Sequence, residues 1–289
     1  MPSTPIEDVA DTAFMVATER AMEGDRPDAL FRDPLSAKLA GERGRRIVAS
    51  LGKQAVLSTW TLAMRTSIID AYIKDSLTKG VTQVVNLGAG LDARPYRQEL
   101  PASLQWVEVD VPKIIDHKEA VLGAETPRCQ LERIRLDLAD RPARARLFAE
   151  LNARAPNTLV LTEGVVPYLP NDEVGSLADD LRAQEHFKLW VVDYFSPLTL
   201  KWRQRRAVRA RMVNAPWRFA PPDWFGFFAA HGWGLKEIRY LFEEGKRLGR
   251  PPPLSFPVKI LGTLRGLLVS PKRRAEFKKF AGYAVLERK

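Results

Sequence analysis

The sequence is poor in the residues that build disulfides and metal centres. Its 289 residues include one cysteine, Cys129, and three histidines, His117, His186 and His231. A single thiol cannot close an intramolecular disulfide, and no cysteine/histidine group has the spacing of metal ligands. We therefore expect an intracellular, cytoplasmic protein that binds no metal.

Long uninterrupted hydrophobic runs are also missing. The start of the chain carries Glu7 and Asp11 instead of a basic region followed by an apolar one, which argues against a secretory signal. The longest late apolar stretch, residues 258–269, contains Lys259 and Arg265 and is too short to cross a bilayer. We expect no membrane partner.

The composition is that of a folded globular protein. Hydrophobic residues make up 45% of the chain and aromatic residues 9%, which is enough for a substantial core in one large α/β domain. The net charge of +10 permits an anionic partner, and the densest basic run is residues 201–211. Basic residues at helical spacing more commonly form a solvated helix face, so nucleic acid is the less favoured partner.

A short apolar run that ends in glycines is the feature around which the chain can be placed. Residues 84–87 have the pattern of a buried parallel strand, and Gly88-Ala89-Gly90 follows. Glycines permit a tight turn and close approach of the backbone to a ligand, although Gly-x-Gly also occurs in ordinary turns. The third glycine of the dinucleotide fingerprint is missing, and the acid Asp92 follows. This disfavours NAD or FAD and favours a nucleoside ligand without phosphates.

Acidic residues end the strands predicted after this turn. The second strand ends in Asp110, about 20 residues after the glycines, where a carboxylate can bind ribose hydroxyls. The third delivers Asp137, which suits an adenine amino group, and the fourth ends in Glu163. Open α/β sheets bind ligands at the carboxyl ends of their strands. The sequence therefore predicts an α/β fold with a doubly wound, mostly parallel sheet, whose later strands are expected at residues 104–110, 131–138, 158–164, 188–195, 232–238 and 282–286.

A helical segment precedes the first strand. Residues 1–80 have mainly helical periodicity, with Gly41 and Gly44 expected to end one of the helices. We expect this extension to fold over the ligand edge of the sheet as a lid, although simple packing would produce the same pattern. Residues 81–289 would form the sheet domain, with a cap-like helical insertion at about 196–257.

Several ordered motifs point to one family. They are Asn-Leu-Gly-Ala-Gly-Leu-Asp-Ala-Arg at 86–94, Val-Glu-Val-Asp-Val-Pro at 107–112, Asp-Leu at 137–138 and Glu-Gly-Val-Val-Pro-Tyr-Leu-Pro at 163–170. Together they resemble the bacterial branch of the leucine carboxyl methyltransferase family, and the resemblance runs from the helical extension to the last strand. It implies a class I, Rossmann-like methyltransferase fold with S-adenosylmethionine as the cofactor.

The resemblance also implies roles for individual residues. Arg65 would pair with the methionine carboxylate of the donor, Asp110 would hold the ribose, and Glu163 would close the site near the sulfonium. The implied cofactor-binding residues are Arg65, Gly88, Ala89, Gly90, Asp110, Val111, Asp137, Leu138, Glu163 and Gly164. Residues 12–14 lack the lysine that the eukaryotic protein methyltransferases of the family carry in their first helix, which argues against methylation of a protein.

The chemistry of this family needs little acid–base assistance. A carboxylate acceptor is already ionised near neutral pH, so alignment with the activated methyl group supplies much of the rate. Tyr168, just beyond Glu163, is the candidate catalytic residue that would face the acceptor, unless it packs within its loop. Arg94 and Arg97 would orient an anionic acceptor or pair with nearby acids, and a phenolic acceptor would need a base such as His117.

We therefore predict an S-adenosylmethionine-dependent O-methyltransferase that esterifies a small-molecule acid, such as a polyketide or another secondary metabolite. Two alternatives keep the enzyme class and change the acceptor to a phenolic hydroxyl or a protein C-terminal carboxyl group. A third alternative, from another class, is a protein that binds nucleic acid through the basic run at 201–211.

Overall fold

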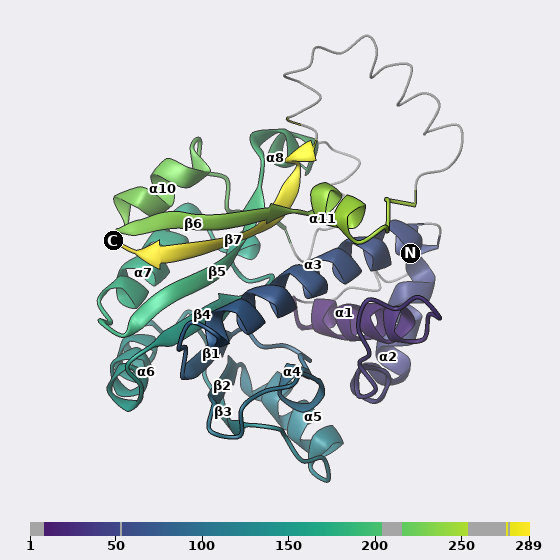
Figure 1. Cartoon of the computed structure of the whole chain (residues 1–289), viewed down its shortest axis with the longest axis horizontal. Helices are drawn as coiled ribbons and strands as arrows, with labels where there is room; N and C mark the ends of the chain where they lie inside the picture. Colours follow the sequence, from purple (N-terminus) through teal and green to yellow (C-terminus); the bar gives the residue numbers. More distant parts are fainter. Residues whose placement is uncertain (1–8, 53, 204–215, 254–275, 277) are drawn as a thin grey trace.

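The computed structural model describes residues 9–52, 54–203, 216–253, 276 and 278–289. Most of the basic run at 201–211 lies outside these residues, as does the apolar stretch at 258–269. The chain forms an α/β structure in which a twisted sheet runs through the centre (Figure 1). No helix in the described ranges has the length and apolar character needed to cross a membrane.

The described residues form a sheet of seven strands in the order β3-β2-β1-β4-β5-β7-β6. β1 to β5 run parallel, and β7 lies antiparallel between β5 and β6. This confirms the predicted doubly wound, mostly parallel sheet. The strands are β1 (Gln83–Leu87), β2 (Gln105–Asp110), β3 (Gln130–Arg135), β4 (Thr158–Thr162), β5 (Phe187–Phe195), β6 (Trp233–Tyr240) and β7 (Ala281–Arg288).

The direction of winding reverses beside β1, which fixes where a ligand can bind. β1 pairs with β2 on one side and with β4 on the other, so the loops after these strands diverge to opposite faces of the sheet. The crevice at such a switch point, outside the carboxyl ends of the strands, is where open α/β sheets bind ligands. The glycine turn follows β1 and therefore lies at this point.

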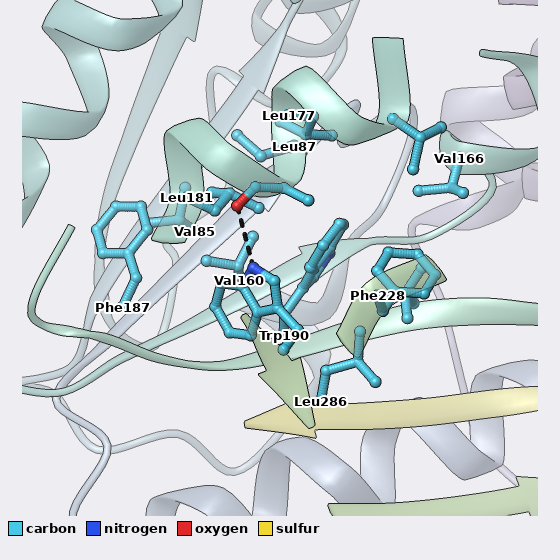
Figure 2. Close-up of a cluster of buried hydrophobic side chains, with 14 of the residues drawn as sticks. Val85, Leu87, Val160, Val166, Leu177, Leu181, Phe187, Trp190, Phe228 and Leu286 are labelled. Atoms are coloured by element: carbon cyan, nitrogen blue, oxygen red, sulfur yellow. Dashed lines mark hydrogen bonds between the residues drawn. The ribbon is translucent and has the colours of Figure 1, made fainter. Parts of the chain in front are cut away.

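Alternating side chains of the strands bury both faces of the sheet. Val84 lies beside Trp106 and Leu159 in the register, and all three pack under α3 (Gln54–Leu77) on one face. The other face carries Val160 and Trp190 and is covered by α6 (Arg141–Arg154), α7 (Asn171–Arg182) and α10 (Trp224–Ala230). Figure 2 shows Trp190 in this second core, beside Val160, Phe228 and Leu286.

The N-terminal region is helical, as predicted. α1 (Val9–Gly24) and α2 (Ser36–Leu51) pack against each other, and both form a third core with α5 (Pro112–Leu122) and the segment after β1 (Figure 1). The other helices in the described part of the chain are α4 (Arg94–Arg97), the 3-10 helix η1 (Val166–Tyr168), α8 (Pro197–Arg203) and α11 (Leu241–Arg247).

The break expected near Gly41 and Gly44 is confirmed at Gly41, whose φ of 56° and ψ of −158° interrupt the helical backbone within α2 (Ser36–Leu51). A second helical stretch runs from this kink to Leu51. Gly44 is helical and faces α1, where a Cβ would lie 2.6 Å from the carbonyl oxygen of Phe14 and overlap Thr18 Oγ1. Gly41 therefore interrupts the helix as predicted, whereas Gly44 serves a close helix contact, a use that a sequence pattern does not distinguish from a helix end.

Candidate functional site

The glycine turn after β1 is held in a conformation that favours glycine. Gly88 has φ 65° and Gly90 has φ 52°, and the Gly88 N–H donates to the carbonyl of Val109 over 2.8 Å. A Cβ on Gly88 would overlap Cγ2 of Val165, and one on Gly90 would lie 3.4 Å from Cβ of Ala13 on α1. The turn is therefore closely packed between the ends of the strands and α1.

Asp110 is the last residue of β2 and joins this strand to the glycine turn. Its Oδ2 accepts the Gly90 N–H over 2.7 Å, and its Oδ1 accepts the Val111 N–H over 2.7 Å. Burial raises the pKa of Asp110, against the effect of these two backbone donors. Because each carboxylate oxygen can accept more than one hydrogen bond, both oxygens can still receive ligand hydroxyls.

Asp137 and Leu138 lie in the loop after β3, beside Asp110. The Leu136 N–H donates to the carbonyl of Asp110 over 2.9 Å, which brings this loop against the end of β2. The Asp137 carboxylate is exposed and accepts the Ala139 N–H over 2.9 Å. Asp110 and Asp137 therefore meet at the same edge, as the sequence predicted for successive strand ends.

Glu163 follows β4 and is surrounded by arginines. Its Oε1 contacts Arg20 over 2.9 Å and Arg65 over 2.6 Å, and its Oε2 contacts Arg94 over 2.6 Å. The carboxylate is only 6% exposed. Burial alone would raise its pKa, but the charges of Arg65, Arg94 and Arg20 hold the pKa of Glu163 well below its usual range. Glu163 is therefore ionised and already neutralised by protein groups.

Arg94 connects three parts of the site. It is fully buried and contacts Asp70 on α3, Asp92 in the glycine turn and Glu163 after β4, over 2.6, 2.8 and 2.6 Å. Burial disfavours the charge of Asp92, yet Arg94 and then Arg20 lower the pKa of Asp92 to about 2. Arg97 likewise binds Asp70 over 2.7 Å. Of the two roles weighed for Arg94 and Arg97, the structure thus shows pairing with acids.

The loop after β4 is fixed by a buried acid from β5. Asp193 accepts the Gly164 N–H over 2.9 Å and a hydrogen bond from the Tyr283 side chain on β7. Burial raises the pKa of Asp193 to about 6, against the opposing effects of Arg65 and the Gly164 N–H. Gly164 has φ 72°, and a Cβ there would lie 3.2 Å from an Nη atom of Arg65. Tyr168 lies further along this loop in η1 and is half-buried.

Sequence reasoning missed the contribution of α1. Arg20 on this helix is 3% exposed and reaches Glu163, and its neighbour Glu19 is also buried. A signal was present, since Ala13, Ala17 and Arg20 are spaced four and three residues apart and share one helix face. Ala13 contacts the glycine turn, so Arg20 is delivered to the strand edge by the same face.

These residues fit an S-adenosylmethionine molecule. Nε of Arg20 and an Nη atom of Arg94 are buried with no hydrogen-bond partner among the described residues, so they retain donor capacity. Arg65 engages Glu163 through Nε, and its Nη groups would be the ones to meet the carboxylate of a bound donor. Asp110 retains acceptor capacity for ribose hydroxyls. Within the described ranges, no group of three His, Cys, Asp or Glu residues could hold a metal ion.

Comparisons with known proteins agree with this geometry. Residues 13–182 match the family model for leucine carboxyl methyltransferase. A relative from Mycobacteroides abscessus, named as an S-adenosyl-L-methionine-dependent methyltransferase, is 32% identical over 92% of this chain and 96% of its own length. A protein from Streptomyces coelicolor with the same description is 32% identical over 83% of this chain and 88% of its own length.

Solved structures share the fold at low sequence identity. A methyltransferase from Thermobifida fusca has a TM-score of 0.57 and 14% identity, covering 99% of this chain and 97% of its own. A DUF574 family protein from Streptomyces avermitilis has a TM-score of 0.54 and 15% identity, covering 96% and 97%. The family match extends over more than half of the chain and includes the glycine turn, Asp110 and Glu163. The chain therefore belongs to the leucine carboxyl methyltransferase family of S-adenosylmethionine-dependent methyltransferases.

Proposed function

We propose that this protein transfers the methyl group of S-adenosylmethionine to a carboxylate oxygen of a small-molecule acid, for example a polyketide or another secondary metabolite. The proposal joins family membership to the chemistry of the site. When bound, the donor supplies a methyl group on a positively charged sulfur, and an ionised carboxylate can attack it without losing a proton first.

The observation that carries the proposal is the placement of the histidines. His117 contacts the carbonyl of Leu39 over 2.9 Å, His186 contacts that of Asn152 over 2.7 Å, and His231 contacts Asp179 over 2.7 Å. None of these partners is Glu163 or one of the arginines that contact it. A phenolic acceptor would need a base at the methyl group, and the candidate His117 is engaged at the α2–α5 contact. This favours an acceptor that needs no base.

The protein's own groups would then bind and orient the donor. Arg65 would pair with its methionine carboxylate, Asp110 with its ribose hydroxyls, and Asp137 with its adenine. Glu163 would close the site near the sulfonium, and its three arginine contacts would hold those arginines in place around the donor. We propose Tyr168 as the residue that faces the acceptor, because η1 follows Glu163 directly in the same loop.

An assay with methyl-labelled S-adenosylmethionine and a panel of carboxylic acids and phenols tests this function. Methyl esters release labelled methanol in alkali, whereas methyl ethers of phenols do not. We expect alkali-labile label on carboxylic acids and its loss in Asp110→Asn. Alkali-stable label on phenols would overturn the proposed acceptor class. Transfer to proteins ending in a free carboxylate, with none to small acids, would instead favour the protein C-terminal alternative.

A further inference from the structure

Glu19 is a buried acid that the proposed reaction leaves without a role. It lies on α1 next to Arg20, is 2% exposed, and its Oε1 has no hydrogen-bond partner among the described residues. Burying a carboxylate without full pairing is costly, and such groups persist mainly where they are functional or neutral. Its place on the helix that covers the glycine turn makes the donor site the first candidate for that function.

The groups around Glu19 compensate its charge poorly. From α3 it receives a side-chain hydrogen bond from Ser58 and the opposite charge of Arg65, which lies two helical turns further along the same face. On α1 itself, Arg20 is engaged by Glu163, and Glu23, one turn away, is engaged by Arg250 over 2.8 Å. Burial therefore dominates and raises the pKa of Glu19 to about 7, with Ser58 and Arg65 opposing.

Arg65 is the group through which Glu19 can act on a ligand. The titratable groups that face Arg65 from the sheet are Glu163 after β4, Asp193 on β5 and Tyr283 on β7. Glu163 already accepts a hydrogen bond from Nε of Arg65. An incoming carboxylate would therefore interact with the positive charge that remains on the rest of the guanidinium group. An ionised Glu19 would compete for that potential, and a neutral Glu19 would leave it intact.

We propose that Glu19 is a positioning residue of the donor site, whose neutral carboxyl group keeps Arg65 available to the methionine carboxylate of S-adenosylmethionine. This inference rests on the role proposed above for Arg65. Ionisation of Glu19 adds a negative charge beside Arg65 and weakens the binding of the donor. Affinity for the donor therefore falls as the pH rises through about 7, because the ionised form of Glu19 becomes dominant there.

Calorimetric titration of the full chain with S-adenosylhomocysteine, the demethylated donor, tests this inference between pH 6 and pH 8.5. For the unaltered protein we expect the Kd to rise about tenfold across this range. Glu19→Gln, which mimics the neutral acid, should keep the low-pH affinity throughout. The matched control Glu42→Gln removes an exposed acid that pairs with Arg45 on α2, and it should retain the full pH dependence.

Two results would overturn the role of Glu19 while leaving the donor site in place. One is a Kd of the unaltered protein that does not rise with pH, which needs no variant to observe. The other is a Glu19→Gln protein with the same pH dependence as Glu42→Gln. Absence of S-adenosylhomocysteine binding at every pH would be a different failure, because it would remove the proposed donor site and this inference with it.

Discussion

At the scale of single residues, Asp110 carries the most testable role in the site. Both of its oxygens accept backbone N–H groups of the turn and still have capacity for ribose hydroxyls. Asp110→Asn keeps the shape but replaces one acceptor by a donor, which then faces an N–H group. We expect the affinity for S-adenosylhomocysteine to fall at least tenfold, or by about 1.5–3 kcal/mol, measured by calorimetry.

The control for this substitution is Asp116→Asn on the surface of α5. Asp116 is exposed and pairs with Arg135, so its loss changes the net charge equally without touching the turn. We expect its affinity for S-adenosylhomocysteine to match that of the unaltered protein. Equal affinities of the Asp110 and Asp116 variants would contradict the proposed binding of the ribose by Asp110.

Gly88 is the residue for which steric and conformational costs can be separated. Gly88→Ala places a Cβ against Val165 and forces a left-handed backbone on alanine, so we expect it to lower the free energy of unfolding by about 3 kcal/mol. Gly249 has a similar φ of 66° with nothing near its Cβ position, so Gly249→Ala should cost only about 1 kcal/mol. Urea denaturation measures both values.

The double substitution Gly88→Ala with Val165→Ala completes this comparison. Removing the Val165 methyl groups relieves the overlap, so the second substitution should recover part of the stability lost in the first. If it instead adds its full cost, the close approach of Val165 to the turn is not what requires glycine at position 88.

Some residues of the site can be placed from the sequence and others cannot. Gly88, Asp110 and Glu163 were placed correctly at one edge, because each follows a strand whose end the local pattern reveals. The ring of arginines around Glu163 could not be derived in this way. Arg20 and Arg65 arrive from helices far away in the chain, and only tertiary packing brings them to the end of β4.

At the scale of elements, the contact between α1 and α2 positions the charged residues of α1. Gly44 allows α2 to approach the backbone of α1, and α1 carries Glu19 and Arg20 to the site. Gly44→Ala should push the two helices apart, because its Cβ would lie 2.6 Å from the carbonyl oxygen of Phe14, which cannot move without the helix. We expect about 2 kcal/mol of lost stability by urea denaturation and weaker S-adenosylhomocysteine binding by calorimetry.

Glu42→Ala tests whether these losses come from packing. Glu42 lies on the same helix but is exposed, so alanine there should leave both stability and binding nearly unchanged. Gly44→Ala with normal stability and normal binding would show that the close contact of α1 and α2 does not govern the site. The roles of residues 1–80 as a lid and of residues 196–257 as a cap remain predictions that binding studies of this kind can approach.

At the scale of the whole molecule, the order of strands follows from the alternation of strands and helices along the chain. That alternation predicts a parallel sheet, and acids at successive strand ends predict on which edge the site lies. The faces of the sheet were less predictable, since α3 covers one of them from before β1. The apolar pattern of α3 is that of any buried helix, so only the folded structure shows which face of the sheet it covers.

The buried acids also give the whole molecule a definite dependence of stability on pH. The pKa values of Asp92 and Glu163 are lowered in the folded state, so their contribution is present above the pKa values of the unfolded chain and is lost in acid. The pKa values of Glu19 and Asp193 are raised, to about 7 and about 6, so stability falls as the pH rises toward those values. We therefore expect the free energy of unfolding to be highest near pH 4–5.

Glu19→Gln isolates one part of this curve. Its side chain cannot ionise, so the variant should lose less stability between pH 5 and pH 8 than the unaltered protein. The rise in the pKa of Glu19 from 4.5 to about 7 sets an upper limit of about 3 kcal/mol on the difference at pH 8. Urea denaturation at the two pH values measures it. Parallel losses in both proteins would show that Glu19 ionises as readily in the folded chain as in the unfolded one. Burial of Glu19 would then impose no free-energy cost on its ionisation that could affect ligand binding.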